Sequence, residues 1–275
     1  MSELSAIQRV QLARTSGRPG TMQFVEHLFT DVFVCKGDRL TREDPSIFAA
    51  VARFHGHPVT VLGHRKGRTA KEIMECNFGM PSPEGYRKAQ RVLRQAEKFG
   101  RPVITFVDTA GAYPGLEAEA GGQGEAIAST LALMSSLTVP VICVVTGEGG
   151  SGGALALAVG NRVLMLENAV YSVLSPEGFA SILWKDSRRS AEAASVMKLT
   201  ANDLLQLGVI DQVIPEPAGG AHTDPDLIYK RVDWAIQKHL EELGKVKDLR
   251  SHRYEKFRAM GAARDASGWP NRKWI

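Results

Sequence analysis

The chain has 275 residues, which suits one large domain or two modest ones with a sizeable buried core. Hydrophobic residues make up 44% and charged residues 23%, a composition typical of a globular protein and unlike that of a disordered chain. The net charge of +4 is mildly basic, and no nucleic-acid-binding motif accompanies the basic stretches at 64–71 and 250–258.

No stretch reaches the roughly 18 apolar residues that a membrane span requires, and the N-terminus lacks the apolar core of a signal peptide. Cys35, Cys76 and Cys143 are odd in number and widely spaced, so they predict neither a disulfide framework nor a metal site. We therefore expect reduced thiols, a cytoplasmic protein and no metal in this chain.

Residues 1–45 are predicted to be an N-terminal helical segment, with a Ser-capped amphipathic helix over 5–14 and a second helix over 22–29. A strand over 58–64 leads into the basic loop. Its cationic side chains are candidates to contact phosphates or an acidic partner surface, although a solvated basic face is the simpler interpretation. These residues are Arg65, Lys66 and Arg68.

From residue 83 onward, apolar strands alternate with helices. The pattern predicts a helix after Pro83, strands over 102–109 and 139–146, a helix over 125–137 between them, and one or two strands within 162–174. Helical patterns follow at 177–184, 189–198 and 200–207, then a strand near 210–214, a long helix or helix pair over 224–260 and a polar tail over 261–275. Unbroken apolar strands joined by helices indicate a parallel sheet covered on both faces.

The segment Gly149–Gly153 matches the G-x-S-x-G pattern of serine hydrolases, in which Ser151 would be the nucleophile. Such an enzyme needs a histidine base, and His222 is the best candidate because His239 and His252 lie in highly charged helical sequence. Helix capping is the plainer role for Ser151. The sequence therefore has parts of a triad without its signature.

The glycines offer a second interpretation. A short helix is predicted to begin near Gly152, and the first amides of a helix have no intrahelical partner. Glycine would let a ligand oxygen approach those amides, which would then form an oxyanion hole. Phosphate binding is the rival use, but the lysine of a P-loop is missing. A second glycine-rich loop, at 109–115, also follows a strand, so the two loops could line one cleft.

Several long motifs together resemble the alpha subunit of bacterial acetyl-CoA carboxylase carboxyltransferase. They occur in the family's order, and the similarity extends from about Arg9 to Met260. The motifs are NFGMPSPEGYRKA, VITFVDTAGAYPG, GQGEAIA, VTGEGGSGGALALAVGNRVLMLENAVYSVLSPEGFASILWKD, LGVIDQVIPEPAGGAH and RYEKFR. The resemblance implies an α/β crotonase-like superhelix of ββα units, spanning 46–260 and flanked by N- and C-terminal helices.

The resemblance also implies an activity. The carboxyl group of carboxybiotin would move to acetyl-CoA and give malonyl-CoA for fatty acid synthesis. A zinc-ribbon-bearing beta subunit would complete the active site in an α2β2 assembly, with biotin carboxylase and the biotin carboxyl carrier protein as further partners. Biotin would be attached to that carrier.

By resemblance, the backbone of Gly152 and Gly153 would hold the biotin ureido oxygen, with no side chain acting as a base. The other residues expected to contact substrate surround them on the two loops: Gly149, Gly150, Ser151, Ala154, Ala110, Gly111, Ala112 and Tyr113. Two alternatives stay open. One is the hydrolase; the other is a stand-alone crotonase-type acyl-CoA enzyme, which would need Glu117, Glu119 or Glu148 as a general acid or base.

Overall fold

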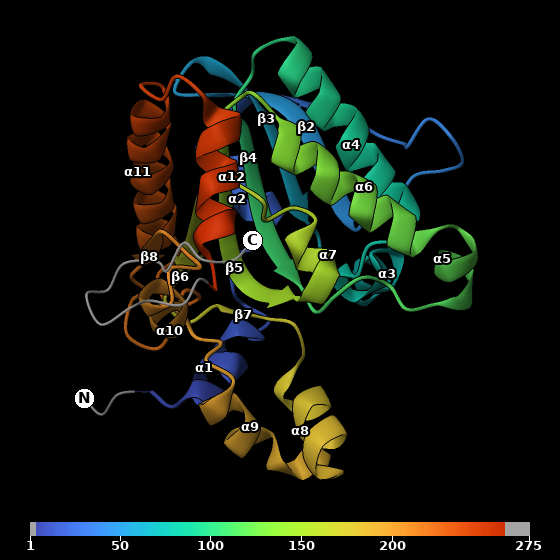
Figure 1. Cartoon of the computed structure of the whole chain (residues 1–275), viewed down its shortest axis with the longest axis vertical. Helices are drawn as coiled ribbons and strands as arrows, with labels where there is room; N and C mark the ends of the chain where they lie inside the picture. Colours follow the sequence, from blue (N-terminus) through green and yellow to red (C-terminus); the bar gives the residue numbers. More distant parts are fainter. Residues whose placement is uncertain (1–3, 262–275) are drawn as a thin grey trace, which may run out of the picture.

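A computed structural model describes residues 4–261 of the protein (Figure 1). Within these residues an eight-stranded sheet has the order β1-β2-β3-β4-β5-β6-β8, and β7 pairs with β5. The strands are β1 (Thr30–Val34), β2 (Ile47–Phe54), β3 (His57–His64), β4 (Val103–Thr109), β5 (Val141–Gly150), β6 (Arg162–Leu166), β7 (Val170–Ser172) and β8 (Gln212–Ile214).

The strands from β3 onward pair in parallel, as the sequence predicts. Their buried, largely β-branched residues suit a sheet that is covered on both faces. Strands β1 and β2 were not predicted from the sequence; β1 pairs antiparallel with β2, and β2 pairs antiparallel with β3. Every residue of β1 is exposed, so β1 lacks the buried, alternating pattern by which strands are recognised.

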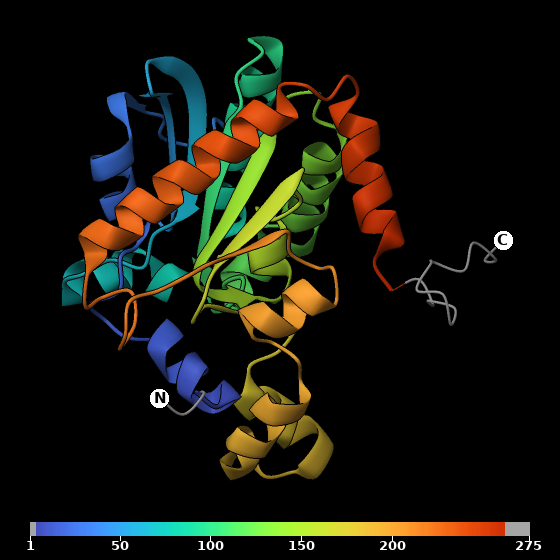
Figure 2. The same ribbon diagram turned by 90° about the vertical axis from the view of Figure 1, so that its left-hand side faces the viewer.

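Helices cover the sheet. The longer ones are α1 (Ala6–Ala13), α2 (Thr21–Leu28), α4 (Pro83–Lys98), α6 (Gln123–Ser136), α8 (Pro176–Trp184), α11 (Pro225–Leu243) and α12 (Leu249–Ala259). The shorter ones are α3 (Ala70–Glu75), α5 (Leu116–Ala120), α7 (Ser151–Leu155), α9 (Ser190–Val196) and α10 (Ala201–Gln206), with single 3-10 turns at Asn77–Gly79 and Ser187–Arg189. In Figure 1, α4 and α6 run side by side, and Figure 2 shows α11 lying obliquely across the sheet.

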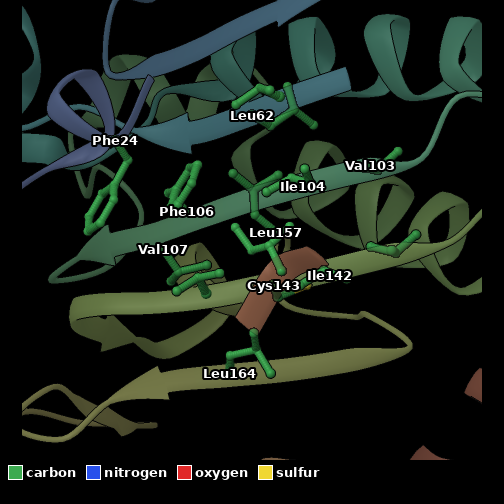
Figure 3. Packing of buried hydrophobic residues seen from close by; sticks show 14 of the residues in the cluster. Phe24, Leu62, Val103, Ile104, Phe106, Val107, Ile142, Cys143, Leu157 and Leu164 are labelled. Carbon is green, nitrogen blue, oxygen red and sulfur yellow. The ribbon is translucent and has the colours of Figure 1, made fainter. Parts of the chain in front are cut away.

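The main core lies between the sheet and these helices. The ring of Phe24 on α2 stacks on that of Phe106 on β4 at 5.0 Å between centroids, and Tyr229 on α11 meets Phe24 edge-on. Figure 3 shows Phe106 and its neighbours on β4 beside residues of β5 and β6, with Leu157 packed among them. Leu157 follows α7 and is fully buried, so the core fixes α7 at the end of β5.

A smaller group of helices lies beyond the end of the sheet. Helices α1, α8 and α9 gather there in both ribbon views (Figures 1 and 2). Val10 and Ala13 of α1 pack with Ala194 of α9 in a hydrophobic cluster of their own. This arrangement brings α1 next to β5 and β7.

The sequence-based boundaries need one correction. Residues 1–45 contain the two predicted helices, but they also contribute β1, so the segment is not purely helical and the sheet extends across residue 45. The predicted tail over 261–275 lies outside the described residues except for Gly261. Among residues 4–261, no helix has both the length and the apolar character needed to cross a membrane.

Candidate active site at two glycine-rich loops

The first loop follows β4 and is held by hydrogen bonds of its backbone with the Thr109 side chain and with a neighbouring segment. The Thr109 hydroxyl donates to the carbonyl oxygen of Gly111 at 2.7 Å, and the Gly111 amide donates back to that hydroxyl at 3.1 Å. Further along, the Tyr113 amide donates to the carbonyl oxygen of Pro81 at 3.0 Å. Gly111 has φ +156, a conformation that L-residues rarely adopt. The loop therefore has a defined shape of its own.

The second loop is a continuation of the central strand. The expectation that this strand ends at Thr146 is wrong: β5 extends to Gly150 because its last residues pair with β7, whereas its first half pairs with β6. Ser151 then adopts φ +53 and begins α7. The chain thus changes from extended to helical within one residue. The first amides of α7 therefore lie at the carboxyl end of the central strand, without an intrahelical acceptor.

The two loops touch through their backbones. A Cβ atom on Gly150 would lie 2.0 Å from the carbonyl oxygen of Ala110, and one on Gly153 would lie 2.5 Å from the amide nitrogen of Ala112. Both distances are far below van der Waals contact. Glycine at 150 and 153 is thus required by the packing of loop on loop. Protein backbone thus occupies the Cβ side of both glycines, and the approach of a ligand oxygen to the amides stays a prediction.

Gly152 differs from its neighbours. A Cβ atom there would meet only Ile127 on α6, at 3.5 Å, so this glycine is not required by packing. The amides of Gly152 and Gly153 have no backbone acceptor within the described part of the chain. Gly153 is buried, whereas Gly152 is partly exposed. The backbone at Gly152 is therefore the more accessible donor of the predicted pair.

An apolar cavity of about 710 Å³ borders Ser151 and Gly152. Tyr171 and Lys198 are its only ionisable lining residues in the described chain, so neither a carboxylate nor an imidazole faces it. Its apolar lining comes from α7, β6, α8, α10 and α12 and from the segments beside these elements and β7: Leu155, Ala158, Val163, Val173, Leu174, Phe179, Met197, Leu204, Leu207, Val209, Phe257 and Met260. Such a cavity suits a largely apolar ligand with one polar group directed at the Gly152 backbone.

The remaining predicted contacts divide into two groups. Gly111, Ala112 and Tyr113 are partly exposed and Ala110 is exposed, so the first loop is accessible. In contrast, Ala154 is fully buried in the main core, and a Cβ atom on Gly149 would lie 2.6 Å from the ring of Tyr171. The Tyr171 ring thus packs against the Cα of Gly149, and the methyl group of Ala154 packs in the core.

The serine-hydrolase arrangement is not assembled. No histidine lines the cavity beside Ser151. His222 lies next to Gly17 in the segment after α1, and His239 hydrogen-bonds Gln212 and Glu242. Ser151 is not a helix cap either, because Gly150 occupies the N-cap position and no side-chain cap forms. The hydrolase hypothesis therefore lacks its general base.

The candidate general acids or bases are also engaged or distant from the apolar cavity. Glu148 pairs with Arg14 at 2.7 Å and with Lys66 at 3.2 Å. Glu117 and Glu119 are exposed on α5. Hydrogen bonds from the backbone amide of Glu117 itself, and then from the Tyr113 hydroxyl, hold the pKa of the Glu117 carboxyl below its usual value. None of the three faces the apolar cavity.

The basic loop lies beside the first glycine-rich loop, where it lines a polar cleft of about 890 Å³ together with Ala110. Arg65 pairs with Glu72 at 2.8 Å and Lys66 pairs with Asp108 at 2.7 Å. In the described part of the chain the guanidinium of Arg68 has no ion-pair partner. The loop is thus placed where expected, but acids within the chain already engage two of its three cations.

Two residues near the loops were missed. Asp108 directly precedes the first loop, and its Oδ1 accepts the Glu148 amide at 2.8 Å. His64 ends β3 and is fully buried; burial lowers its pKa to about 4, although the nearby Asp108 acts in the opposite direction. In the sequence, Asp108 is one polar residue in an apolar strand and His64 heads a basic run. A polar residue at the carboxyl end of a parallel strand was the available signal for Asp108.

Comparison with known proteins identifies the family of this chain. Residues 1–261 match the family model described as acetyl co-enzyme A carboxylase carboxyltransferase-like. The chain belongs to the acetyl-coenzyme A carboxylase carboxyltransferase family. Relatives named acetyl-coenzyme A carboxylase carboxyl transferase subunit alpha include those of Syntrophotalea carbinolica (58% identical) and Anoxybacillus flavithermus (56%). Each alignment covers 94% of this chain, and 83% and 81% of the respective relative.

Solved structures support the fold of this carboxyltransferase family member. The transcarboxylase 12S structure with methylmalonyl-coenzyme A bound aligns with a TM-score of 0.66 at 20% identity, over 86% of this chain and 45% of that chain. A Pseudomonas malonate decarboxylase hetero-tetramer in complex with coenzyme A aligns with a TM-score of 0.62 at 21% identity, over 76% of this chain and 84% of the other. The predicted crotonase-like α/β fold is confirmed.

Proposed function

We propose that this chain is the alpha component of a biotin-dependent carboxyltransferase that moves a carboxyl group from carboxybiotin to acetyl-CoA and forms malonyl-CoA. The observation that carries the proposal is an apolar cavity whose border includes the backbone of Gly152 and which no carboxylate or imidazole of the described chain lines. A transfer that needs polarised oxygen and no protein base is the chemistry that suits such a site. The family membership supports the same activity.

The residues present fit a biotin group. Its bicyclic ring is largely apolar and carries one strong acceptor, the ureido oxygen, which suits an apolar cavity bordered by Gly152, whose amide has no backbone acceptor in the described chain. When bound, carboxybiotin supplies the carboxyl group and leaves negative charge on that oxygen. In our proposal the Gly152 amide, with Gly153 behind it, donates to this charge. One such donor contributes about 3–4 kcal/mol to the transition state.

The rest of the chain positions these donors. Gly150 is the last residue of the central strand β5, where it pairs with β7. The backbone of the first loop packs against Gly150 and Gly153. Residues of α8 and α12 contribute apolar walls that exclude water. In a water-poor site, fixed amides interact more strongly with developing charge than they would in bulk solvent.

We also propose that a beta subunit with the zinc ribbon covers the apolar cavity, in an α2β2 assembly that the biotin carboxyl carrier protein and biotin carboxylase serve. The relatives are named as a subunit, which supports a multi-subunit enzyme. Exposed apolar side chains lie on and near the cavity: Val173, which lines it, is 77% exposed, and Ile182 and Leu183 of α8, the helix that contributes Phe179 to the lining, are 56% and 59% exposed. Cys35, Cys76 and Cys143 are free thiols, which supports the cytoplasmic location we propose.

Reconstitution tests the proposal. The chain is purified alone and together with a candidate beta subunit, and transfer of carboxyl from malonyl-CoA to free biotin is measured for both. We expect turnover only from the mixture. Turnover by the pure single chain would overturn the role of the partner, and absence of turnover from an assembled complex would overturn the activity.

The proposed docking face has a matched test. Val173→Asp places a charge on the cavity rim, whereas Leu40→Asp alters a side chain of similar exposure, 73%, on the β1–β2 connection. We expect the first variant to lose binding of the beta subunit in size-exclusion chromatography and the second to retain it. Equal binding by both variants would show that the partner lies elsewhere.

A further inference from the structure

A chain of charged side chains connects the ends of the two strands that lead into the glycine-rich loops. The Lys66 ammonium lies 2.7 Å from Oδ1 of Asp108 and 3.2 Å from Oε2 of Glu148. Arg14 of the segment after α1 contacts the other oxygen of Glu148 at 2.7 Å. The proposed chemistry assigns no role to this set as a whole.

Each acid lies near the end of a strand that leads into a different loop. Asp108 is the penultimate residue of β4, directly before the first loop, and Glu148 lies in the part of β5 that leads into Gly149–Gly153. The Asp108 carboxylate also accepts the Glu148 amide at 2.8 Å. A Cβ atom on Gly147 would lie 2.3 Å from Oδ1 of Asp108, so glycine at 147 permits this close approach. The strand ends are therefore joined by one carboxylate and one ammonium.

The ammonium is needed for charge balance. Burial alone would lower the pKa of Lys66, but the adjacent Asp108 and Glu148 outweigh burial, and the pKa lies above its usual value. Lys66 is therefore protonated in the physiological pH range. Without it, two partly buried carboxylates would face each other and Arg14, which is 38% exposed, would be the only remaining cation among the contacts described. Repulsion between the carboxylates would push the two loops apart.

We propose that Lys66 is a positioning residue: by bridging Asp108 and Glu148 it fixes the two glycine-rich loops against each other and so sets the direction of the Gly152 and Gly153 amides. This inference rests on the proposed carboxyl transfer. It differs from the expectation that the basic loop binds phosphate, because the Lys66 ammonium is directed at the loops of its own chain. A positioning role predicts a change in turnover with little change in substrate affinity.

The test compares single and double variants in the assembled complex. Lys66→Met removes the bridge, and a displacement of about 1 Å at the amides reduces kcat about 10²-fold, with KM for the acyl-CoA within about threefold. Lys66→Met combined with Glu148→Gln removes the repulsion as well, so we expect it to recover at least about tenfold of the lost kcat. Lys238→Met on α11, where the lysine pairs with Glu242, is the matched control and should retain full kcat.

The outcomes separate the alternatives. A rise in KM with unchanged kcat would overturn the positioning role in favour of a phosphate contact, and a double variant without recovery would overturn it in favour of a long-range charge effect. If Lys66→Met fails to fold, Lys66→Arg keeps the charge and is expected to retain at least about a tenth of kcat; a full loss in that folded variant would also overturn the inference. Absence of transfer by the unaltered complex would instead overturn the proposed function.

Discussion

Substituting Gly153 with alanine should weaken both the fold and the activity, because of the contact between the two loops. The new Cβ would lie 2.5 Å from the Ala112 nitrogen and from the Gly111 carbonyl carbon. Relieving that overlap needs a separation of about 1 Å between backbones that both belong to well-packed segments. Overpacking of this kind costs about 1–3 kcal/mol in the free energy of unfolding. The same displacement at the amides should reduce kcat about 10²-fold.

Gly152→Ala is the matched control for stability. Its Cβ would meet Ile127 at an ordinary contact distance of 3.5 Å. Because alanine also reduces the freedom of the unfolded chain, we expect a free energy of unfolding equal to that of the unaltered chain or up to about 1 kcal/mol higher. Urea unfolding of the purified chain measures stability, and carboxyl transfer from malonyl-CoA to biotin by the complex measures kcat. An unchanged unfolding midpoint in Gly153→Ala would refute the inference that packing between the loops requires glycine there.

Three further predictions concern side chains around the loops. Ser151→Ala should retain transfer within about tenfold, since no base contacts Ser151; a loss beyond about a hundredfold in a folded complex would revive the nucleophile hypothesis. Buried His64 stays neutral in the folded chain while the unfolded chain takes up a proton below pH 6.5. The free energy of unfolding should therefore be highest above pH 6.5 and about 2 kcal/mol lower at about pH 5. His64→Gln should lose less between these two pH values, and urea unfolding at both measures the difference. Arg68→Glu should raise KM for the acyl-CoA at low ionic strength and not at high; equal KM at both would leave Arg68 as a plain surface charge.

Sequence patterns predicted the parallel sheet, its covering helices and the position of both glycine-rich loops, because buried strands and amphipathic helices each have a characteristic periodicity. The antiparallel β1 and β2 were missed: β1 is exposed throughout, and the alternation in β2 is weak. The end of β5 was also placed too early. Pairing between β5 and β7 keeps Gly147–Gly150 extended, and glycine has no local preference that would predict it.

The candidate site was predicted only in part. The short helix predicted after a strand indicated backbone donors near Gly152, and the long sequence motifs indicated the family. In contrast, the contact of Gly150 with Ala110 joins residues forty positions apart, and nothing in the local sequence distinguishes a glycine that packs from one that faces a ligand. The bridge from Lys66 to Asp108 was missed for the same reason, since a cation in a basic run gives no sign of a buried partner.

The divided pairing of β5 has a consequence for the timing of site formation. Residues that lead into the proposed donors belong to the hydrogen-bond ladder of the central sheet, up to Gly150 opposite Ser172. Their amides should therefore exchange with solvent deuterium as slowly as those of the buried strands, with or without substrates present. A site anchored in this way is preorganised before any ligand arrives. Little entropy is then lost on binding, and the ordering has already been achieved during folding.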